Sequence, residues 1–175
     1  MKAKRIKNDE LLDLVNEKDE VIGTVWKSDA HKDPSKIHRE VAVAVFNKQG
    51  EVLLQKRSLK KEHHPGRWAI TAGHVGAGEE PEHAAKRELF EELGWKNEIK
   101  FLGKIFAQDN KESRIFWIYY VLVNGESSVN FDKEEIEDVG WINFRKIAEF
   151  SKENEYVLKG TTHRILTRVL TEVGI

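Results

Sequence analysis

The stretch GHVGAGEEPEHAAKRELFEELGW, residues 73 to 95, carries the pattern that decides the fold. A glycine-rich loop runs there into a segment in which six residues from Glu79 to Glu92 are acidic, although the formal net charge of the chain is only −1. Side chains three and four positions apart on a helix are neighbours, so like charges at that spacing repel each other. The crowding therefore predicts that a cation from outside the chain belongs to this segment.

The same stretch predicts a helix that begins at Glu79 or Glu80 and stops at Gly94. Pro81 falls in the first turn, where proline is tolerated, and glycine is common just after the last helical residue. On such a helix, three carboxylates share an arc of about 100°, and the adjacent arc is apolar. The carboxylates are Glu88, Glu91 and Glu92, and the apolar residues are Ala85, Leu89 and Leu93.

An acidic face next to an apolar one lies close to the protein body and is partly desolvated. Carboxylates held together in such a place either raise their pKa values or bind cations, and oxygen ligands suit hard ions such as Mg²⁺ or Mn²⁺. A helix rich in Glu, Lys and Arg is more often a solvated face, so composition alone does not choose between a metal site and a plain surface.

Strands are predicted on both sides of this helix, and further helices towards the end of the chain. LLDLVN (11–16) and VIGTVW (21–26) form an expected hairpin, and EVAVAVFN and EVLLQKR an expected strand pair. The later expected strands are EIKFLGKIFAQ, ESRIFWIYYVLV and the short VGWINF, and the later expected helices are FRKIAEF and THRILTRVLTEV. This order indicates an α/β or α+β layered domain.

The composition is that of an ordinary folded protein of 175 residues, with 39% hydrophobic and 34% charged residues. Lys and Arg number 29 and Asp and Glu number 30, so no global field draws the chain to DNA or to a membrane. The absence of cysteine excludes disulfides, thiolate metal sites and a cysteine nucleophile. No signal peptide or membrane-spanning run is evident, which predicts a cytoplasmic protein.

Eight residues of the opening stretch fit the pattern G-x5-E-x7-R-E-U-x-E-E-x-G-U, where U is a bulky apolar residue. They are Gly73, Glu79, Arg87, Glu88, Leu89, Glu91, Glu92 and Gly94. The segment resembles the signature box of the Nudix hydrolases, with Trp95 at a last position that is usually aliphatic. The resemblance implies an α/β fold, the Nudix α/β/α sandwich with a mixed sheet, to which the expected hairpin is an N-terminal extension. We expect a single domain over residues 1–175, divided into the extension (1–35) and the core (37–175) with the Nudix box at 73–95.

The resemblance also implies a reaction: hydrolysis of a diphosphate linkage in a nucleoside di- or triphosphate or a related derivative, by water attack on phosphorus. The expected cofactor is Mg²⁺ or Mn²⁺, because divalent ions neutralise charge that gathers on phosphate oxygens. The expected partner is a small-molecule diphosphate, with no role for DNA or a membrane. Carried over position by position, the metal ligands are Glu88, Glu92 and Glu91, with a backbone carbonyl of Ala72 or Gly73.

The remaining box residues have less certain roles. Arg87 is expected to orient the carboxylates through charge-assisted hydrogen bonds, and Glu79 is either a structural cap or a functional group. The general base is either Glu88 or an acid outside the box. Glu135, in the run FDKEEIEDVGW, is the outside candidate, and an exposed acidic loop is its plain alternative.

Substrate contacts are expected after the second core strand. Lys56 and Arg57, followed by Lys60 and Lys61, offer positive charge for a diphosphate. Trp68 offers an aromatic face for stacking. Against these expectations, loop lysines more often serve solubility, and aromatic residues on strands more often belong to the core.

A second resemblance is to the isopentenyl diphosphate isomerase-like branch of the family. It rests on the VIGTV hairpin, the spaced pair His31 and His38, the run HREVAVAVFNKQGEVLLQKRSLKKEHHPGRW and the sequence AGH that ends at His74. In such isomerases, histidines at these three positions hold a metal, and a cysteine at the position of Ala72 does acid/base work. Without cysteine, the balance favours hydrolysis, with the isomerase reaction and a non-catalytic nucleotide sensor as alternatives. The histidines are then a second metal site, phosphate donors or structural residues; for His38, followed by Arg39, structural or phosphate-contacting roles come first.

Overall fold

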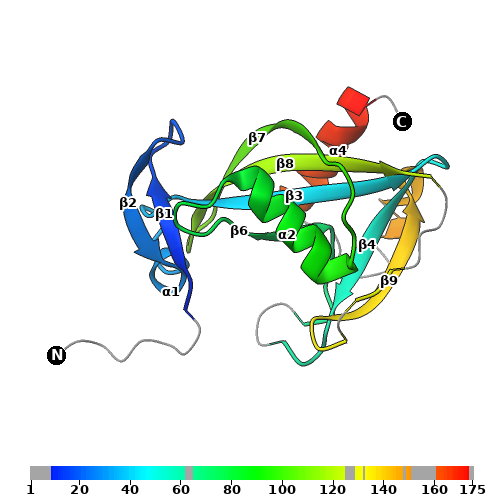
Figure 1. Cartoon of the computed structure of the whole chain (residues 1–175), viewed down its shortest axis with the longest axis horizontal. Coiled ribbons are helices and arrows are strands. Elements are labelled where there is room, and N and C mark those ends of the chain that lie inside the picture. Colours follow the sequence, from blue (N-terminus) through cyan, green and yellow to red (C-terminus); the bar gives the residue numbers. More distant parts are fainter. Residues whose placement is uncertain are drawn as a thin grey trace.

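The computed structural model describes residues 9–61, 65–124, 129–131, 133–147, 149–150 and 161–173. A two-stranded hairpin lies at one end of the molecule, beside the main sheet (Figure 1). Its strands β1 (Leu11–Val15) and β2 (Val21–Trp26) pair antiparallel and are followed by the short helix α1 (Lys27–Ala30). The predicted N-terminal hairpin extension is confirmed.

The main sheet has seven strands in the order β5-β4-β3-β8-β7, with β6 paired to β3 and β9 paired to β4. The strands are β3 (His38–Asn47), β4 (Glu51–Arg57), β5 (Trp68–Ala69), β6 (Thr71–His74), β7 (Lys100–Gln108), β8 (Ser113–Val123) and β9 (Ile136–Asn143). β3 runs parallel to β8, whereas the other described pairs are antiparallel. The sheet is therefore mixed, as predicted.

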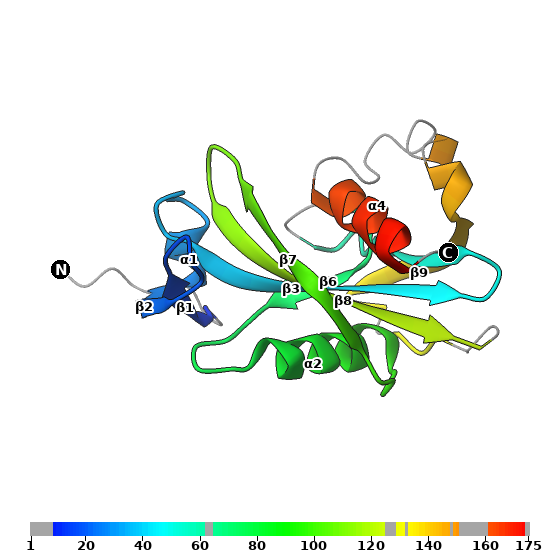
Figure 2. The same ribbon diagram turned by 90° about the horizontal axis from the view of Figure 1, so that it is seen from above.

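One helix covers each face of the sheet (Figure 2). α2 (Pro81–Leu93) begins at the predicted proline and ends before Gly94, whose φ of 72° is a left-handed conformation that suits glycine. α4 (Thr161–Val173) covers the opposite face, and the expected helix before it begins as a 3₁₀ turn, η1 (Phe144–Lys146). The two layers of helix around a mixed sheet confirm the predicted sandwich. No helix in the described ranges is long and apolar enough to cross a bilayer.

β3 shows why the sheet is covered on both faces. Its side chains alternate between two buried clusters: Val41, Val43 and Val45 pack in the cluster beneath α2, and Ala42, Ala44 and Phe46 pack in the one beneath α4. A strand that is buried on both faces has a nearly continuous apolar sequence. The run VAVAVF therefore follows from the position of β3 between the two helices.

Candidate active site

The second half of α2 brings two partly buried glutamates against the sheet. Glu92 Oε2 accepts a hydrogen bond of 2.5 Å from Gln55 Nε2 on β4. Burial raises the pKa of Glu92 to about 8, despite hydrogen bonds that favour its charged form. Burial also raises the pKa of Glu88 to about 7, although the neighbouring Arg87 opposes that shift. Without a bound cation, both carboxyl groups therefore resist ionisation near neutral pH.

Gly73 on β6 makes room for the Glu88 carboxylate. A Cβ atom at position 73 would lie 2.1 Å from the carboxyl carbon of Glu88 and 2.2 Å from its Oε1, far inside van der Waals contact. Only glycine allows the strand and the carboxylate to approach so closely. The first glycine of the quoted stretch is thus required by the glutamate that follows it fifteen positions later in the chain.

Arg87 ties the acidic face to the loop before the helix. It donates to both carboxylate oxygens of Glu79 at 3.0 Å, to Glu88 Oε1 at 2.5 Å and to the backbone carbonyl of His74 at 3.0 Å. Glu79 Oε2 in turn accepts from the backbone N–H of Gly76 at 2.9 Å. These contacts suit a residue that orients carboxylates, and they give Glu79 a structural partner in the glycine loop.

The donors on this face fit a hard divalent cation. Glu88, Glu92 and the more exposed Glu91 present oxygen atoms only, which is the ligand set that Mg²⁺ and Mn²⁺ prefer. Arg87 is the cation paired with Glu88 and, at 3.4 Å, with Glu91. When all three carboxylates are ionised, one guanidinium leaves an excess of negative charge, which a divalent ion would offset.

A second group of possible ligands lies where the extension meets the core. His31, His38, Glu40 and His74 each offer one ligand atom, and these atoms all lie within 4.8 Å of one another. The Nε2 atoms of His31 and His74 are 2.9 Å apart, and His74 Nε2 lies 3.3 Å from Glu40 Oε1. His38 is fully buried, and its Nε2 has no hydrogen-bond partner in the described part of the chain. A buried polar atom without a partner, aimed among three other ligands, fits a metal ion at this place.

The surroundings of His31 and His74 favour the neutral form of these two imidazoles, as metal ligation requires. Burial lowers the pKa of His74 to about 4, and burial also lowers the pKa of His31. Burial alone would raise the pKa of Glu40, but its neighbours His74, His38 and Arg114 together lower it to about 2. Glu40 is therefore ionised and supplies the negative charge of the group.

The two groups use opposite faces of β6. Gly73 pairs with Val41, whose side chain packs in the cluster beneath α2, and the next residue His74 pairs with Glu40. Because successive residues of a strand point to opposite faces, Gly73 and His74 serve different sites. The three histidines grouped by the second resemblance thus come together, apart from the glutamate face.

Several residues expected to contact substrate make contacts with other side chains of the protein. Arg39 donates to Asp19 Oδ1 and to the Asp19 backbone carbonyl, both at 2.6 Å, so it anchors the turn of the hairpin. Lys56 pairs with Glu137 at 3.5 Å, and Trp68 packs edge-on against Phe150 with ring centroids 5.6 Å apart. The substrate roles of these residues and of Arg57 stay predictions.

The lysine loop after β4 is paired with the acidic segment before β9. Lys60 Nζ lies 2.5 Å from Glu134 Oε1, and Lys61 forms an ion pair with Glu135. Glu135, the outside candidate for the general base, therefore lies at a surface ion pair. Its catalytic role also stays a prediction.

Three residues of these sites were not predicted from the sequence. Gln55 and Glu40 each sit in an apolar strand run with no local signal that sets them apart, and Arg114 follows the polar turn before β8. The buried polar residues among them are recognisable only from strand pairing. The last box residue, Trp95, is buried in the cluster beneath α2 and packs there as an apolar residue.

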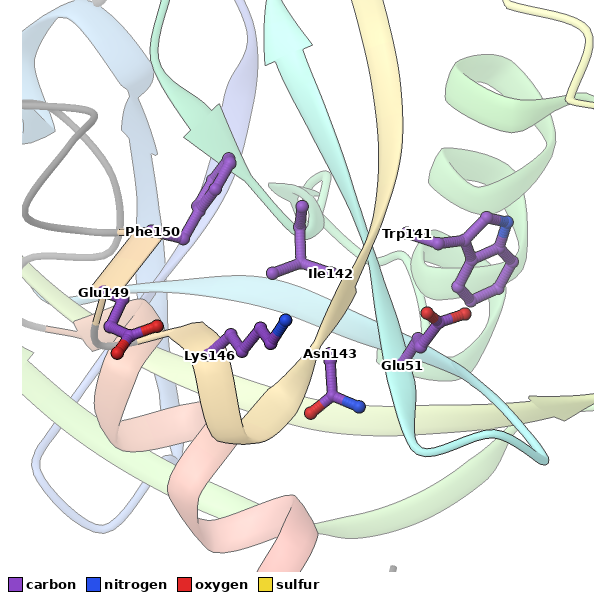
Figure 3. A pocket seen from close by; sticks show the side chains of 7 residues that line it. All are labelled: Glu51, Trp141, Ile142, Asn143, Lys146, Glu149 and Phe150. Carbon is purple, nitrogen blue, oxygen red and sulfur yellow. The ribbon is translucent and has the colours of Figure 1, made fainter.

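A separate pocket of about 450 Å³ opens at the other end of the β4–β9 pair (Figure 3). It is lined by Glu51, Trp141, Ile142, Asn143, Lys146, Glu149 and Phe150. Glu51 lies four residues before Gln55 on β4, which corresponds to about 13 Å along the strand. No predicted site residue lines this pocket, and its side chains come from other elements than α2.

The fold and the helix that carries the box are those expected of a Nudix protein. Comparison with known proteins leads to the same family. The family model of the NUDIX domain matches residues 36–160. The chain therefore belongs to the Nudix family.

Its curated relatives carry two kinds of name. An isopentenyl-diphosphate Delta-isomerase of Streptomyces avermitilis is 35% identical over 147 residues, which cover 79% of this chain and 74% of that protein. The Streptomyces coelicolor isomerase is 47% identical over 85 residues, but the match spans only 48% of this chain and 43% of the relative. An uncharacterised Nudix hydrolase of Listeria monocytogenes is 28% identical over 83% of this chain and 86% of its own length.

Solved structures share the fold at low sequence identity. A crystal structure from Deinococcus radiodurans superposes with a TM-score of 0.74 at 23% identity, covering 90% of this chain and 98% of that one. The NUDIX domain of NrtR from Shewanella oneidensis, solved with ADP ribose, has a TM-score of 0.61 at 17% identity and covers 77% of this chain and 87% of that one. These likenesses show the fold.

Proposed function

We propose that this Nudix protein hydrolyses a diphosphate linkage in a nucleoside di- or triphosphate or a related derivative, with Mg²⁺ or Mn²⁺ as cofactor. The observation that carries the proposal is the pair of partly buried carboxylates, Glu88 and Glu92, held against Gly73 and Gln55. Burial disfavours the charged form of both groups, and a divalent cation would offset that cost. The related fold solved with ADP ribose supports a nucleotide as substrate.

In this proposal the chain contributes positioning and proton transfer. A divalent ion, when bound, neutralises phosphate charge and lowers the pKa of the attacking water. Glu88, Glu92 and Glu91 would hold it, together with a backbone carbonyl of Ala72 or Gly73. Arg87 fixes the direction of the Glu88 carboxylate through its short hydrogen bond.

Glu88 is the first candidate for the general base. In the metal-free chain, burial raises its pKa to about 7, which brings this carboxyl group into the range of a base that works near neutral pH. Glu135 is the second candidate, and it would have to leave its ion pair with Lys61 to reach a substrate. Lys56, Arg57 and Trp68, at the ends of β4 and β5, are the proposed substrate contacts, with His38 and Arg39 as the more distant ones.

The isomerase reaction is a second candidate because relatives carry that name and because the three histidines meet in one group. Ala72, however, offers no titratable side chain where those isomerases use cysteine. The chain contains no cysteine that could take over the role. Hydrolysis requires no such group, so the absence of cysteine favours hydrolysis over isomerisation.

A turnover screen distinguishes these reactions. The purified chain is incubated with nucleotides, nucleotide sugars and isoprenoid diphosphates, with Mg²⁺ or with chelator, and phosphate, diphosphate and isomerised product are measured. We expect Mg²⁺-dependent hydrolysis of a nucleotide derivative that Glu92→Gln abolishes and that Glu82→Gln, an exposed change on the same helix, leaves intact. Isomerised product without hydrolysis would support the second candidate, and tight nucleotide binding without turnover of any compound would indicate a sensor.

A further inference from the structure

A buried glutamine stands on the sheet face beneath α2, where its neighbours are apolar. Gln55 on β4 is only 7% exposed. Leu53, two residues earlier on the same strand face, packs in the cluster beneath α2, and Val139, directly opposite on β9, packs against that cluster. A polar side chain in such a place costs free energy unless its hydrogen bonds are made. The partners of the Gln55 amide group therefore indicate its role.

Within the described ranges, the hydrogen bond of this amide group goes to the acidic helix. Gln55 Nε2 donates to Glu92 Oε2 at 2.5 Å. Gln55 Oε1 is buried and has no hydrogen-bond partner among the described residues. A buried acceptor without a partner destabilises the folded protein, so an apolar side chain would serve packing better at this position. The stability of the fold alone does not explain why a glutamine stands there.

The sheet limits how far Gln55 can move. It pairs with Ala69 of β5 on one side of β4 and with Val139 of β9 on the other. The last side-chain torsion of a glutamate, in contrast, has a broad range, so a free carboxylate turns easily. The hydrogen bond from Gln55 Nε2 therefore restricts the orientation of the Glu92 carboxylate relative to the sheet.

The amide group has an advantage over a cationic donor at this place. A lysine or arginine beside Glu92 would also orient the carboxylate, but its positive charge would compete with a metal ion. The uncharged amide donates a hydrogen bond and leaves the negative charge of an ionised Glu92 available. In this respect Gln55 differs from Arg87, which pairs with Glu88 as a cation.

We propose that Gln55 is a positioning residue, which holds the Glu92 carboxylate in the orientation that binds the divalent ion. The inference rests on the proposed function, because Glu92 is a metal ligand only in that proposal. Partners that orient ligating side chains typically change metal affinity about 10- to 100-fold. The cation site thus includes a β4 residue that lies outside the Nudix box at 73–95.

The test measures metal binding by the full-length chain without substrate. The protein is stripped with chelator and titrated with Mn²⁺, and electron paramagnetic resonance counts the free ion. Glu92→Gln identifies the part of the binding that belongs to the glutamate face. We expect Gln55→Met, which keeps the length of the side chain but has no donor, to weaken this part about 10-fold or more and to change the spectrum of the bound ion.

Gln108→Met is the matched control. Gln108 on β7 also donates a side-chain hydrogen bond, to Ser113 Oγ at 2.9 Å, so its replacement by methionine removes a comparable bond elsewhere in the sheet. The affinity for Mn²⁺ should stay unchanged in this variant. In a turnover assay, the Mg²⁺ concentration that gives half the maximal rate should rise in Gln55→Met by the same factor as the Mn²⁺ dissociation constant. The KM for substrate at saturating Mg²⁺ should change little.

The outcomes separate the role of Gln55 from the proposed function. Urea unfolding of the metal-free variants shows whether each one is folded; a purely structural role would lower the unfolding midpoint of Gln55→Met and leave its Mn²⁺ affinity unchanged. Unchanged affinity in Gln55→Met, or an equal loss in Gln108→Met, overturns the inference even when Glu92→Gln abolishes binding. If Glu92→Gln binds Mn²⁺ like the unmodified chain, the proposed cation site is wrong, and the role of Gln55 is refuted with it.

Discussion

Replacing Glu92 by glutamine should stabilise the metal-free protein at alkaline pH. The folded-state pKa of Glu92, raised to about 8 by burial, lies well above the ordinary value of 4.5. A raised pKa means that the folded protein binds a proton that the unfolded chain has already lost. The stability that comes from this proton is fully present below pH 4.5 and is lost progressively as pH rises to about 8.

The size of the effect follows from the shift. Each pH unit between the two pKa values is worth about 1.4 kcal/mol, so ionisation of Glu92 costs on the order of 5 kcal/mol above pH 8. Glutamine has nearly the same shape and no charge, so Glu92→Gln avoids this cost. The difference in unfolding free energy between the variant and the unmodified chain should therefore grow in favour of the variant from pH 5 to pH 8.5, by about 2–4 kcal/mol.

Urea unfolding in the presence of chelator, at half-unit steps of pH, measures this difference directly. Other titrating groups, including the histidines, are common to both proteins and cancel in it. Glu82→Gln is the control, because Glu82 is exposed in the first turn of the same helix, and its curve should run parallel to that of the unmodified chain. If the curve for Glu92→Gln is also parallel, Glu92 is not the buried ionisable group described above, and the electrostatic reason for a cation at this face is lost. Added Mg²⁺ should stabilise the unmodified chain at pH 8 and leave the variant unchanged.

Three further outcomes are expected. Gly73→Ala should cost about 1–3 kcal/mol in unfolding free energy and abolish Mg²⁺-dependent turnover, because the new Cβ clashes with Glu88; turnover at the original rate would refute the close approach. Arg39→Met should release the hairpin turn and destabilise the fold by about 1–3 kcal/mol, because it removes the guanidinium that pairs with Asp13 and Asp19 and leaves Lys104 as the cation beside Asp19; thermal melts and limited proteolysis between β1 and β2 would detect this. Glu135→Gln should lower kcat about 100-fold or more with KM little changed if it is the base, measured against Glu134→Gln, and equal kcat values in the two variants would assign the base to the helix.

The spacing of residues along the sequence was sufficient to predict that these glutamates share one face of the helix. The helix bounds and the shared arc of Glu88 and Glu92 lie within one stretch of chain, where helical geometry fixes relative positions. The close approach of Gly73 to Glu88 was found only in the structure. The strand and helix runs predicted only a layered α/β or α+β domain. The α/β/α sandwich was implied by the resemblance to the Nudix hydrolases.

Partners that meet across strands were not predictable in the same way. Gln55 meets Glu92, and Glu40 meets His74, only because of the register of β4 and of β3 with β6. Register depends on the whole sheet, including the parallel pairing of β3 with β8, and no short pattern encodes it. The last predicted strand, residues 139–144, was too short for a related reason. It begins at Ile136, since the acidic residues that looked like a loop pair with the end of β4.

The glutamate face and the histidine group lie on opposite faces of β6, so a change at one site can affect the other. Gly73 and His74 are consecutive, and Arg87 donates both to Glu88 on one side and to the carbonyl of His74 on the other. A shift of this four-residue strand that moves Gly73 beside the glutamate face must also move His74 in the histidine group. Occupancy of the imidazole site should therefore change the affinity of the carboxylate site, and thermodynamic reciprocity requires the reverse effect to be equal in size.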